Sequence, residues 1–266
     1  MSEPDTNATM AVFLDLENIA LGAKDANFPP FDIKLVLERM LLRGHIVVKK
    51  AYCDFGRYKD FKRDLHEAAF ELIDIPHVRQ SGKNSADIRM VVDALDLCYT
   101  KQHLDTFVIL SGDSDFSPLV SKLRENAKTV VGMGVKNSSS DLFINNCDQF
   151  IYYDDLVREK PALAPRRKAE PKPDGAMPKK SGGPSLEQAL EQVAATLAAI
   201  DSERGKDFRI TGSLMKQTMQ RRNPGFNERA HGFKSFRDLL KAAEQKGILK
   251  IEIDEKSRDY RVYSVD

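Results

Sequence analysis

Two aspartates that follow an apolar run in the middle of the chain indicate a site for a divalent cation. The run Thr106–Leu110 is rich in β-branched and aromatic residues, and we expect it to form a strand buried on both faces. After a Ser-Gly pair, Asp113 and Asp115 stand one residue apart, and a helical spacing of apolar residues begins at Phe116. Because ligands bind outside the carboxyl ends of strands in open parallel sheets, these acids predict a metal site in the strand-to-helix turn.

Two further acids occupy comparable places in the sequence. Asp15 directly follows a second apolar run, Ala11–Leu14, and Asp87 lies in the first turn of a long predicted helix. Asp87 has an alternative interpretation as a residue favoured by the helix dipole, and Asp115 as the N-cap of the helix that follows it. Asp15 and Asp113 are harder to explain as caps, because Ser or Asn would serve equally well in that role.

Four clustered carboxylates cannot all remain ionised without a counter-charge. Carboxylate oxygens are the ligands that hard cations such as Mg²⁺ and Mn²⁺ prefer. One or two such ions generate a hydroxide nucleophile and stabilise the leaving oxygen of a phosphodiester. The acids therefore indicate metal-dependent nuclease chemistry.

The elements around these acids alternate between strands and helices. This alternation predicts an α/β fold, a three-layer parallel sheet with right-handed crossovers. The apolar runs predict strands at 11–14, 46–53, 71–78, 106–110, 129–133 and 149–153, and the helical spacings predict helices at 32–43, 58–70, 85–99, 116–126 and around 141.

Charge and composition divide the chain into three parts. The 266 residues, 41% of them apolar, suffice for two domains of ordinary size. The formal net charge is −6 over residues 1–157, +5 over 158–184 and +2 over 185–266. The middle part is rich in Pro and Gly and lacks apolar periodicity, so we expect a flexible basic tether. Attraction of a polyanion explains this asymmetry, with solvated surface charge as the alternative.

Nothing in the sequence directs the chain to a membrane or out of the cell. No run of about eighteen apolar residues occurs, and the first ten residues are polar. Cys53, Cys98 and Cys147 are widely spaced, which favours buried thiols in a reducing compartment over disulfides or a zinc cluster. We therefore expect a cytoplasmic protein without a membrane partner.

Residues 185–266 predict a small α+β domain. Helical apolar spacing begins after Ser185, which forms a loose capping box with Gln188. Further helices are predicted at 210–222 and 234–246, and the alternating stretches 248–253 and 259–265 predict a hairpin. Three helices followed by a terminal hairpin are typical of a winged helix.

Three stretches of the first part form a specific set in this order: Phe13–Asn18, Lys83 with Asp87–Met90, and Ser111–Leu119. Through them the sequence over about residues 10–157 resembles the NYN domains of the PIN-like ribonuclease superfamily. The resemblance implies a PIN-like fold and an RNA substrate.

The resemblance also implies roles for individual side chains. Asp15, Asp87, Asp113 and Asp115 would be the catalytic, metal-binding acids. Asn18 and Ser111 would orient water or substrate, and Lys83 would contact a phosphate group. Asp93 falls in the same motif region but lies about 120° around the helix from Asp87. Glu17 would point away from the site if the first strand continued through it.

Two other enzyme classes use similar short motifs. Haloacid-dehalogenase-like phosphatases need Asp where this chain has Glu17, and again where it has Ser117. A toprim domain expects a glutamate, not Asp15, at the end of its first strand. These departures count against both classes.

Two stretches of the C-terminal part, Gly232–Leu240 and Gly247–Leu249, carry a second resemblance. Through them this part resembles the OST-HTH (LOTUS) domain, which accompanies NYN domains and is associated with RNA or protein binding. Basic residues of the tether and of this domain are candidates for nucleic-acid contact, with solvated surface as the alternative. These candidates are Arg166, Arg167, Lys168, Lys216, Arg221, Arg222 and Lys234.

The sequence thus predicts a catalytic domain over residues 1–157, a linker over 158–184 and a winged helix over 185–266. We expect a metal-dependent ribonuclease, an endonuclease, that takes Mg²⁺ or Mn²⁺ and whose winged helix selects RNA or a protein partner. The alternative is a non-catalytic RNA-binding adaptor that retains the acidic pocket.

Overall fold

The computed structural model describes residues 8–76, 85–159, 185–253 and 260–265. The chain divides into two compact units, residues 1–163 and 164–266.

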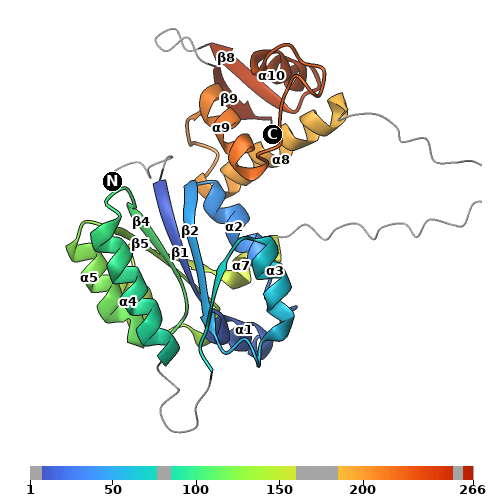
Figure 1. Cartoon of the computed structure of the whole chain (residues 1–266). Coiled ribbons are helices and arrows are strands. Elements are labelled where there is room, and N and C mark those ends of the chain that lie inside the picture. The colour runs from blue at the N-terminus through green and yellow to red at the C-terminus, as the bar shows by residue number, and fades with distance from the viewer. Residues whose placement is uncertain (1–7, 77–84, 160–184, 254–259, 266) are drawn as a thin grey trace, which may run out of the picture. The chain divides into compact units, whose positions relative to one another are not determined.

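The first unit alternates strands and helices, as Figure 1 shows. Short 3₁₀ turns in the described loops are Lys59–Phe61, Ser114–Phe116 and Lys136–Ser138. The strands are β1 (Ala8–Asp15), β2 (Gly44–Cys53), β3 (Glu71–Asp74), β4 (Thr106–Leu110), β5 (Thr129–Gly134) and β6 (Gln149–Tyr152). The helices are α1 (Leu16–Asp25), α2 (Ile33–Leu41), α3 (Lys62–Glu67), α4 (Ser85–Thr100), α5 (Ser117–Glu125), α6 (Asp141–Asn146) and α7 (Tyr153–Glu159).

The six strands form one parallel sheet in the order β3-β2-β1-β4-β5-β6. The chain therefore builds outward from β1 in one direction and then restarts at β4 on the other side of β1. The carboxyl ends of β1 and β4, paired up to Leu14 and Leu110, flank this switch point. In open α/β sheets a ligand crevice opens there.

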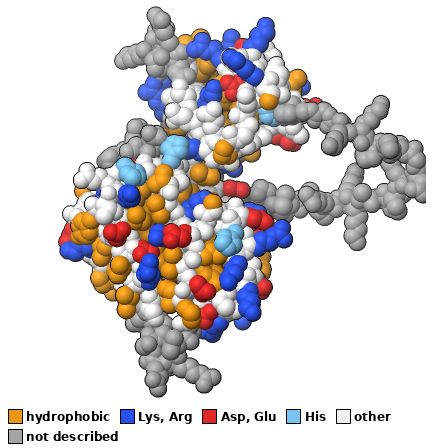
Figure 2. Space-filling view, in the orientation of Figure 1, with side chains coloured by type: hydrophobic (Ala, Val, Ile, Leu, Met, Phe, Trp, Pro, Cys, Tyr) orange, Lys and Arg blue, Asp and Glu red, His pale blue; other side chains and the backbone are white. Residues whose placement is uncertain are grey.

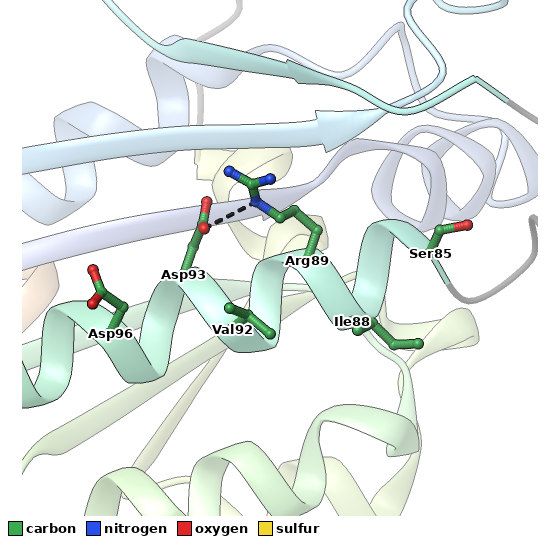
Figure 3. A pocket seen from close by; sticks show the side chains of 6 residues that line it. All are labelled: Ser85, Ile88, Arg89, Val92, Asp93 and Asp96. Carbon is green, nitrogen blue, oxygen red and sulfur yellow. Dashed lines mark hydrogen bonds and ion pairs between the residues drawn. The ribbon is translucent and has the colours of Figure 1, made fainter.

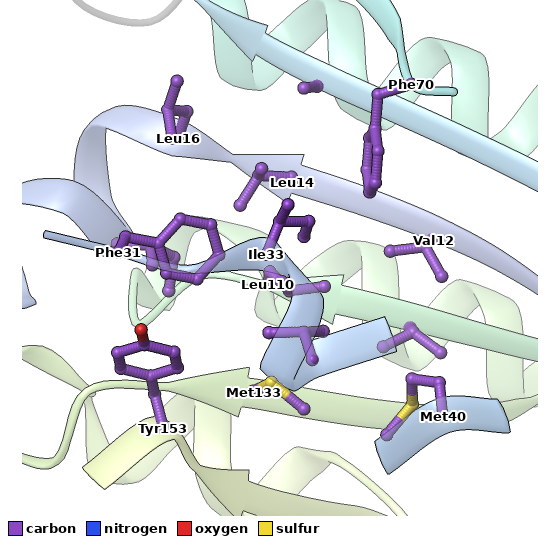
Figure 4. Packing of buried hydrophobic residues seen from close by; sticks show 14 of the residues in the cluster. Val12, Leu14, Leu16, Phe31, Ile33, Met40, Phe70, Leu110, Met133 and Tyr153 are labelled. Atoms are coloured by element: carbon purple, nitrogen blue, oxygen red, sulfur yellow. The ribbon is translucent and has the colours of Figure 1, made fainter. Parts of the chain in front are cut away.

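Apolar residues pack on both faces of the sheet. The central strands therefore contain continuous apolar runs and do not alternate with polar residues. Val12 and Leu14 of β1 pack with α1, α2 and α7 on one face, part of which Figure 4 shows. Phe13 packs with α4, α5 and α6 on the other face. There its ring stacks on that of Phe107, with 6.0 Å between centroids.

The structure confirms the predicted parallel α/β fold in three layers. It adds two helices that the sequence analysis did not predict, α1 and α7, each of which begins directly after a strand. In α1 the small residues Gly22 and Ala23 occupy buried positions, which weakened the apolar spacing. Strand β3 ends at Asp74, and the end of the predicted range 71–78 lies outside the described residues.

The described residues of the second unit form three helices and a three-stranded antiparallel sheet in the order β7-β9-β8. The capping box of Ser185 and Gln188 is present at the start of its first helix. Its elements are α8 (Leu186–Arg204), β7 (Ile210–Thr211), α9 (Gly212–Arg222), α10 (Phe236–Gln245), β8 (Leu249–Ile253) and β9 (Tyr260–Ser264).

Across the described parts of both units, none of the helices combines the length and apolar character that crossing a bilayer requires. All three cysteines are free thiols. Cys53 and Cys98 are buried and Cys147 is partly buried.

Replacing Phe13 by Ala should lower the free energy of unfolding by about 3–5 kcal/mol, since it leaves a cavity against Phe107 in a packed core. Urea unfolding followed by circular dichroism measures this loss. The matched control is Val47→Ala in β2, where the side chain is 51% exposed and the loss should stay below about 1 kcal/mol. Equal losses in the two variants would contradict the assigned core.

Candidate acidic site

Asp15 is the last residue of β1 and also the N-cap of α1. One of its carboxylate oxygens accepts from the backbone N–H of Asn18 at 3.3 Å. The other accepts from the hydroxyl of Ser111 at 2.9 Å. The whole residue is only 9% exposed, so these two donors hold a nearly buried side chain in place.

The loop after β4 brings Asp113 to the same edge of the sheet. The hydroxyl of Ser111 that donates to Asp15 also accepts from the backbone N–H of Asp113 at 3.2 Å. Asp113 itself accepts from the N–H of Asp115 at 2.9 Å and so caps the 3₁₀ turn that follows. Ser111 is fully buried and thus links the two acids from beneath the site.

Asn18 ties the two strand-to-helix turns together. Its side-chain oxygen accepts from the backbone N–H of Gly112 at 2.8 Å. A Cβ at Gly112 would lie 2.2 Å from the carbonyl oxygen of Ser138, which belongs to the loop after β5. Only glycine therefore fits where the turn after β4 meets that loop. Asn18 is therefore engaged in positioning the loop, and Ser111 in positioning the acids.

The structure contradicts the alternative that Asp115 caps the helix that follows it, whereas Asp87 does lie in the first turn of α4. Asp115 is exposed and does not cap α5, whose N-cap is Phe116 without a side-chain hydrogen bond. Asp15 and Asp113 do cap the turns that follow them. A cap needs only one carboxylate oxygen, so this role leaves the second oxygen of Asp113 available to a ligand.

Asp87 lies in the first turn of α4 and is partly buried. Its charge interacts with those of Asp15 and Asp113. Burial raises its pKa to about 6, and the charges of Asp113, Asp115 and Glu17 add to the increase. Burial likewise raises the pKa of Asp15 to about 7, and the charges of Asp87 and Asp113 contribute. The predicted acids therefore repel one another.

Glu17 is a member of this group that the sequence analysis set aside. The strand ends at Asp15, so Glu17 lies in the first turn of α1 and its charge acts on Asp87. The expectation that it points away assumed a continuing strand, which the structure does not have. Recognising Asp15 as a helix N-cap would have placed it correctly.

Asp93 belongs to a different environment, farther along α4, where Figure 3 shows it paired with Arg89. It pairs with Lys50 at 3.2 Å and Arg89 at 3.0 Å, and it accepts from the hydroxyl of Tyr52 at 2.9 Å. Burial acts to raise its pKa, but the hydrogen bonds from Tyr52 and Lys50 outweigh it and the pKa is lowered. Asp93 is thus fully occupied in ion pairs, in contrast to Asp87.

The donor chemistry of the site fits a hard divalent cation. Among the described residues, no three His, Cys, Asp or Glu side chains are grouped tightly enough to hold one ion. Mg²⁺ nevertheless keeps several waters and is usually bound by one or two carboxylates together with substrate phosphates. Carboxylates that repel one another at the carboxyl edge of the sheet suit this kind of binding.

The basic residues that the sequence suggests for nucleic-acid contact differ in their surroundings. Lys83, Arg166, Arg167 and Lys168 lie outside the described residues. In the second unit, Lys216 pairs with Glu228 at 2.9 Å. Arg222 donates to the carbonyl of Ala195 at 3.2 Å, and Lys234 is exposed.

The structure contradicts the prediction that Arg221 contacts nucleic acid. Its residue is only 7% exposed, and its guanidinium donates to the hydroxyl of Thr218 at 3.0 Å inside the unit. Burial lowers its pKa, and the charge of Arg204 adds to this effect. Arg221 is therefore a packed interior residue and is not presented to a nucleic acid.

Residues 9–154 match the model of the NYN domain family, more than half of the chain. The chain therefore belongs to the NYN-domain family. NYN domains are PIN-like nuclease domains, so this membership supports an RNA-related role. The match covers β1 to the start of α7, including all four predicted acids.

Two similar proteins support this placement. A protein of Xenopus tropicalis named meiosis regulator and mRNA stability factor 1 is 23% identical over 157 residues, which are 59% of this chain but only 9% of that protein. A crystal structure of a Vibrio parahaemolyticus protein of unknown function is 25% identical, with a TM-score of 0.51. That likeness covers 58% of this chain and 98% of the Vibrio chain, and it shows the shared fold.

Asp15→Asn should make the metal-free protein less sensitive to rising pH. Because the pKa of Asp15 is about 7 when folded and 3.8 in the reference state, the folded protein binds more protons between these values. Stability is therefore lost as pH rises toward and through 7, by about 2–4 kcal/mol for this group. Thermal unfolding in EDTA at pH 5 and pH 8 should show a smaller loss for the variant than for the wild type.

Asp93→Asn is the matched control for this measurement. The lowered pKa of Asp93 keeps it ionised at both pH values, so its replacement should destabilise the protein equally at each. If Asp15→Asn loses as much stability as the wild type between pH 5 and pH 8, the raised pKa of Asp15 is contradicted.

Proposed function

We propose that the NYN unit is a metal-dependent ribonuclease that hydrolyses RNA phosphodiesters. The observation that carries the proposal is the group of mutually repelling carboxylates at the β1/β4 switch point. The name of the Xenopus relative, an mRNA stability factor, supports RNA as the substrate.

Each acid has a role that follows from its surroundings. One or two of the carboxylates of Asp15, Asp87 and Asp113 would hold Mg²⁺ or Mn²⁺ together with a substrate phosphate, with Asp115 at the exposed margin. The ion would supply a hydroxide nucleophile and charge stabilisation at the leaving oxygen. Ser111 fixes the orientation of Asp15 through the hydrogen bond that its hydroxyl donates. The same hydroxyl accepts from the N–H of Asp113 and so fixes the position of Asp113 relative to Asp15. These hydrogen bonds preorganise the site before substrate arrives.

For the rest of the chain we propose a basic tether over residues 158–184 and a winged-helix domain of the OST-HTH type over 185–266. The order of α8, α9, α10 and the β8-β9 hairpin supports this assignment. In this arrangement the second domain selects RNA or a protein partner.

A non-catalytic RNA-binding adaptor is the second candidate. It is favoured by one observation, that the described acids do not converge into a three-ligand group. The adaptor would bind RNA in the same place without cutting it.

A cleavage assay separates the two candidates. Labelled single-stranded and hairpin RNAs are incubated with the wild type in Mn²⁺ and in EDTA, and we expect products only in Mn²⁺. Asp15→Asn and Asp113→Asn should each lower the cleavage rate by about 100-fold or more, because loss of even an outer partner of a metal site costs 10- to 100-fold.

Asp96→Asn is the matched control, since Asp96 lies exposed on the same helix as Asp87 but outside the acidic group. Its cleavage rate should equal that of the wild type. RNA that is bound but left intact by the wild type in Mn²⁺ would overturn the nuclease and favour the adaptor.

A further inference from the structure

A groove of about 650 Å³ lies at the same edge of the sheet as the acids. This volume falls within the usual range of small-ligand sites. The groove is bounded by α1, by the loop between α1 and α2, and by the segment after β2. A Pro-Pro pair and four aromatic rings line it, and the rings are Phe28, Phe31, Tyr58 and Phe61.

The groove adjoins the acidic site through Arg57 and Glu17. Arg57 lines the groove and follows β2, whose Tyr52 pairs in register with Asp15. Its guanidinium lies 3.9 Å from the carboxylate of Glu17, the acid whose charge acts on Asp87. A ligand in the groove would therefore be next to a phosphate group held at the acids.

Turns at both walls keep the groove open before a ligand arrives. Just after α1, Asn27 adopts the left-handed region at φ 56°, and the N–H of Phe28 donates to the carbonyl of Ala23 at 3.0 Å. These features form a Schellman end, which fixes the direction of Phe28 and the prolines after it. On the other wall, the carboxylate of Asp54 accepts from the N–H of Gly56 at 2.9 Å and shapes the turn before Tyr58.

The aromatic side chains of the groove are suited to stacking on a flat ring. Phe28, Tyr58 and Phe61 are each partly exposed, whereas Phe31 is buried and forms the floor. Tyr58 and Phe61 lie 6.4 Å apart between centroids and are tilted by 44°. Exposed rings in a fixed arrangement are how proteins bind unpaired bases.

The charge of the groove is complementary to a phosphate backbone. Lys24 and Arg57 line it and are exposed, in a part of the chain whose net charge over residues 1–157 is −6. The face of the first unit in Figure 2 shows acidic and basic side chains interspersed, without a continuous basic band. Local cations beside the acids are therefore what would bring a polyanion to the site.

We propose that this groove binds an unpaired nucleobase of the RNA strand whose phosphodiester lies at the acids, with Arg57 contacting the adjoining phosphate. The inference rests on the proposed ribonuclease function and adds to it a preference for single-stranded substrate. An aromatic side chain of a peptide is the competing occupant, and in that case the abasic RNA should bind as tightly as the RNA with 2-aminopurine.

The test uses the full chain in EDTA, so that RNA is bound without being cut. The probe is a single-stranded RNA of about ten nucleotides that carries one 2-aminopurine, whose emission falls when it stacks on a ring. We expect the emission to fall on binding to the wild type. An abasic nucleotide in place of the 2-aminopurine should weaken binding about tenfold, and this arm needs no protein variant.

Three variants locate the effect in the groove. Tyr58→Ala should weaken binding of the RNA about tenfold and restore emission, whereas Tyr58→Phe keeps the ring and should behave as the wild type. Tyr99→Ala removes an aromatic side chain that is 57% exposed on α4, away from the groove, and should have no effect. Melting temperatures of all variants are measured alongside.

The outcomes separate this inference from the proposed function. If the wild type cleaves RNA in Mn²⁺ while folded Tyr58→Ala and the abasic RNA bind unchanged, the base-binding groove is wrong and the ribonuclease stands. If the wild type neither cleaves nor binds RNA, the proposed function is wrong, and the base-binding role of the groove is wrong with it. If Tyr58→Ala is unfolded, unchanged binding of the abasic RNA to the wild type overturns the inference by itself.

Discussion

The mutual repulsion of carboxylates held at one point of a parallel sheet is the constraint on which the rest of this domain depends. Asp15 and Asp113 stand almost one hundred residues apart in the chain, yet adjacent strands end side by side and bring them together. Such a group disfavours the folded state when it is ionised. The surrounding structure must therefore compensate, and it does so with buried donors such as Ser111 and with apolar strands packed on both faces.

The second consequence of the strand order is that different loops meet around the same crevice. The turn after β1 supplies Asp15, Glu17 and Asn18, and the turn after β4 supplies the hydrogen-bonded partners of two of them. The segment after β2 adds Arg57 and the aromatic side chains of the neighbouring groove. A rigid sheet thus positions loops of quite different chemistry, acidic on one side and aromatic and basic on the other.

Much of this arrangement is visible in the sequence, because apolar runs followed by acids are a local signal. The strands around Asp15 and Asp113 and the parallel fold follow directly from such runs. Long-range hydrogen bonds, such as that between Ser111 and Asp15, have no local signal and appear only in three dimensions. Helix α1 was missed because it begins without a turn, and Glu17 was misplaced with it. The burial of Arg221 was equally invisible, since a basic residue near a helix end reads as surface.

The most direct test of the carboxylate group is a carboxyl ¹³C NMR titration of the chain, with and without Mg²⁺. Without metal, Asp15 should titrate near pH 7 and Asp87 near pH 6. Saturating Mg²⁺ should move both titrations well below these values, because the cation favours the ionised forms. If both carboxyls titrate near pH 4 without metal, or if Mg²⁺ leaves their titration unchanged, the account of an acidic metal site is contradicted.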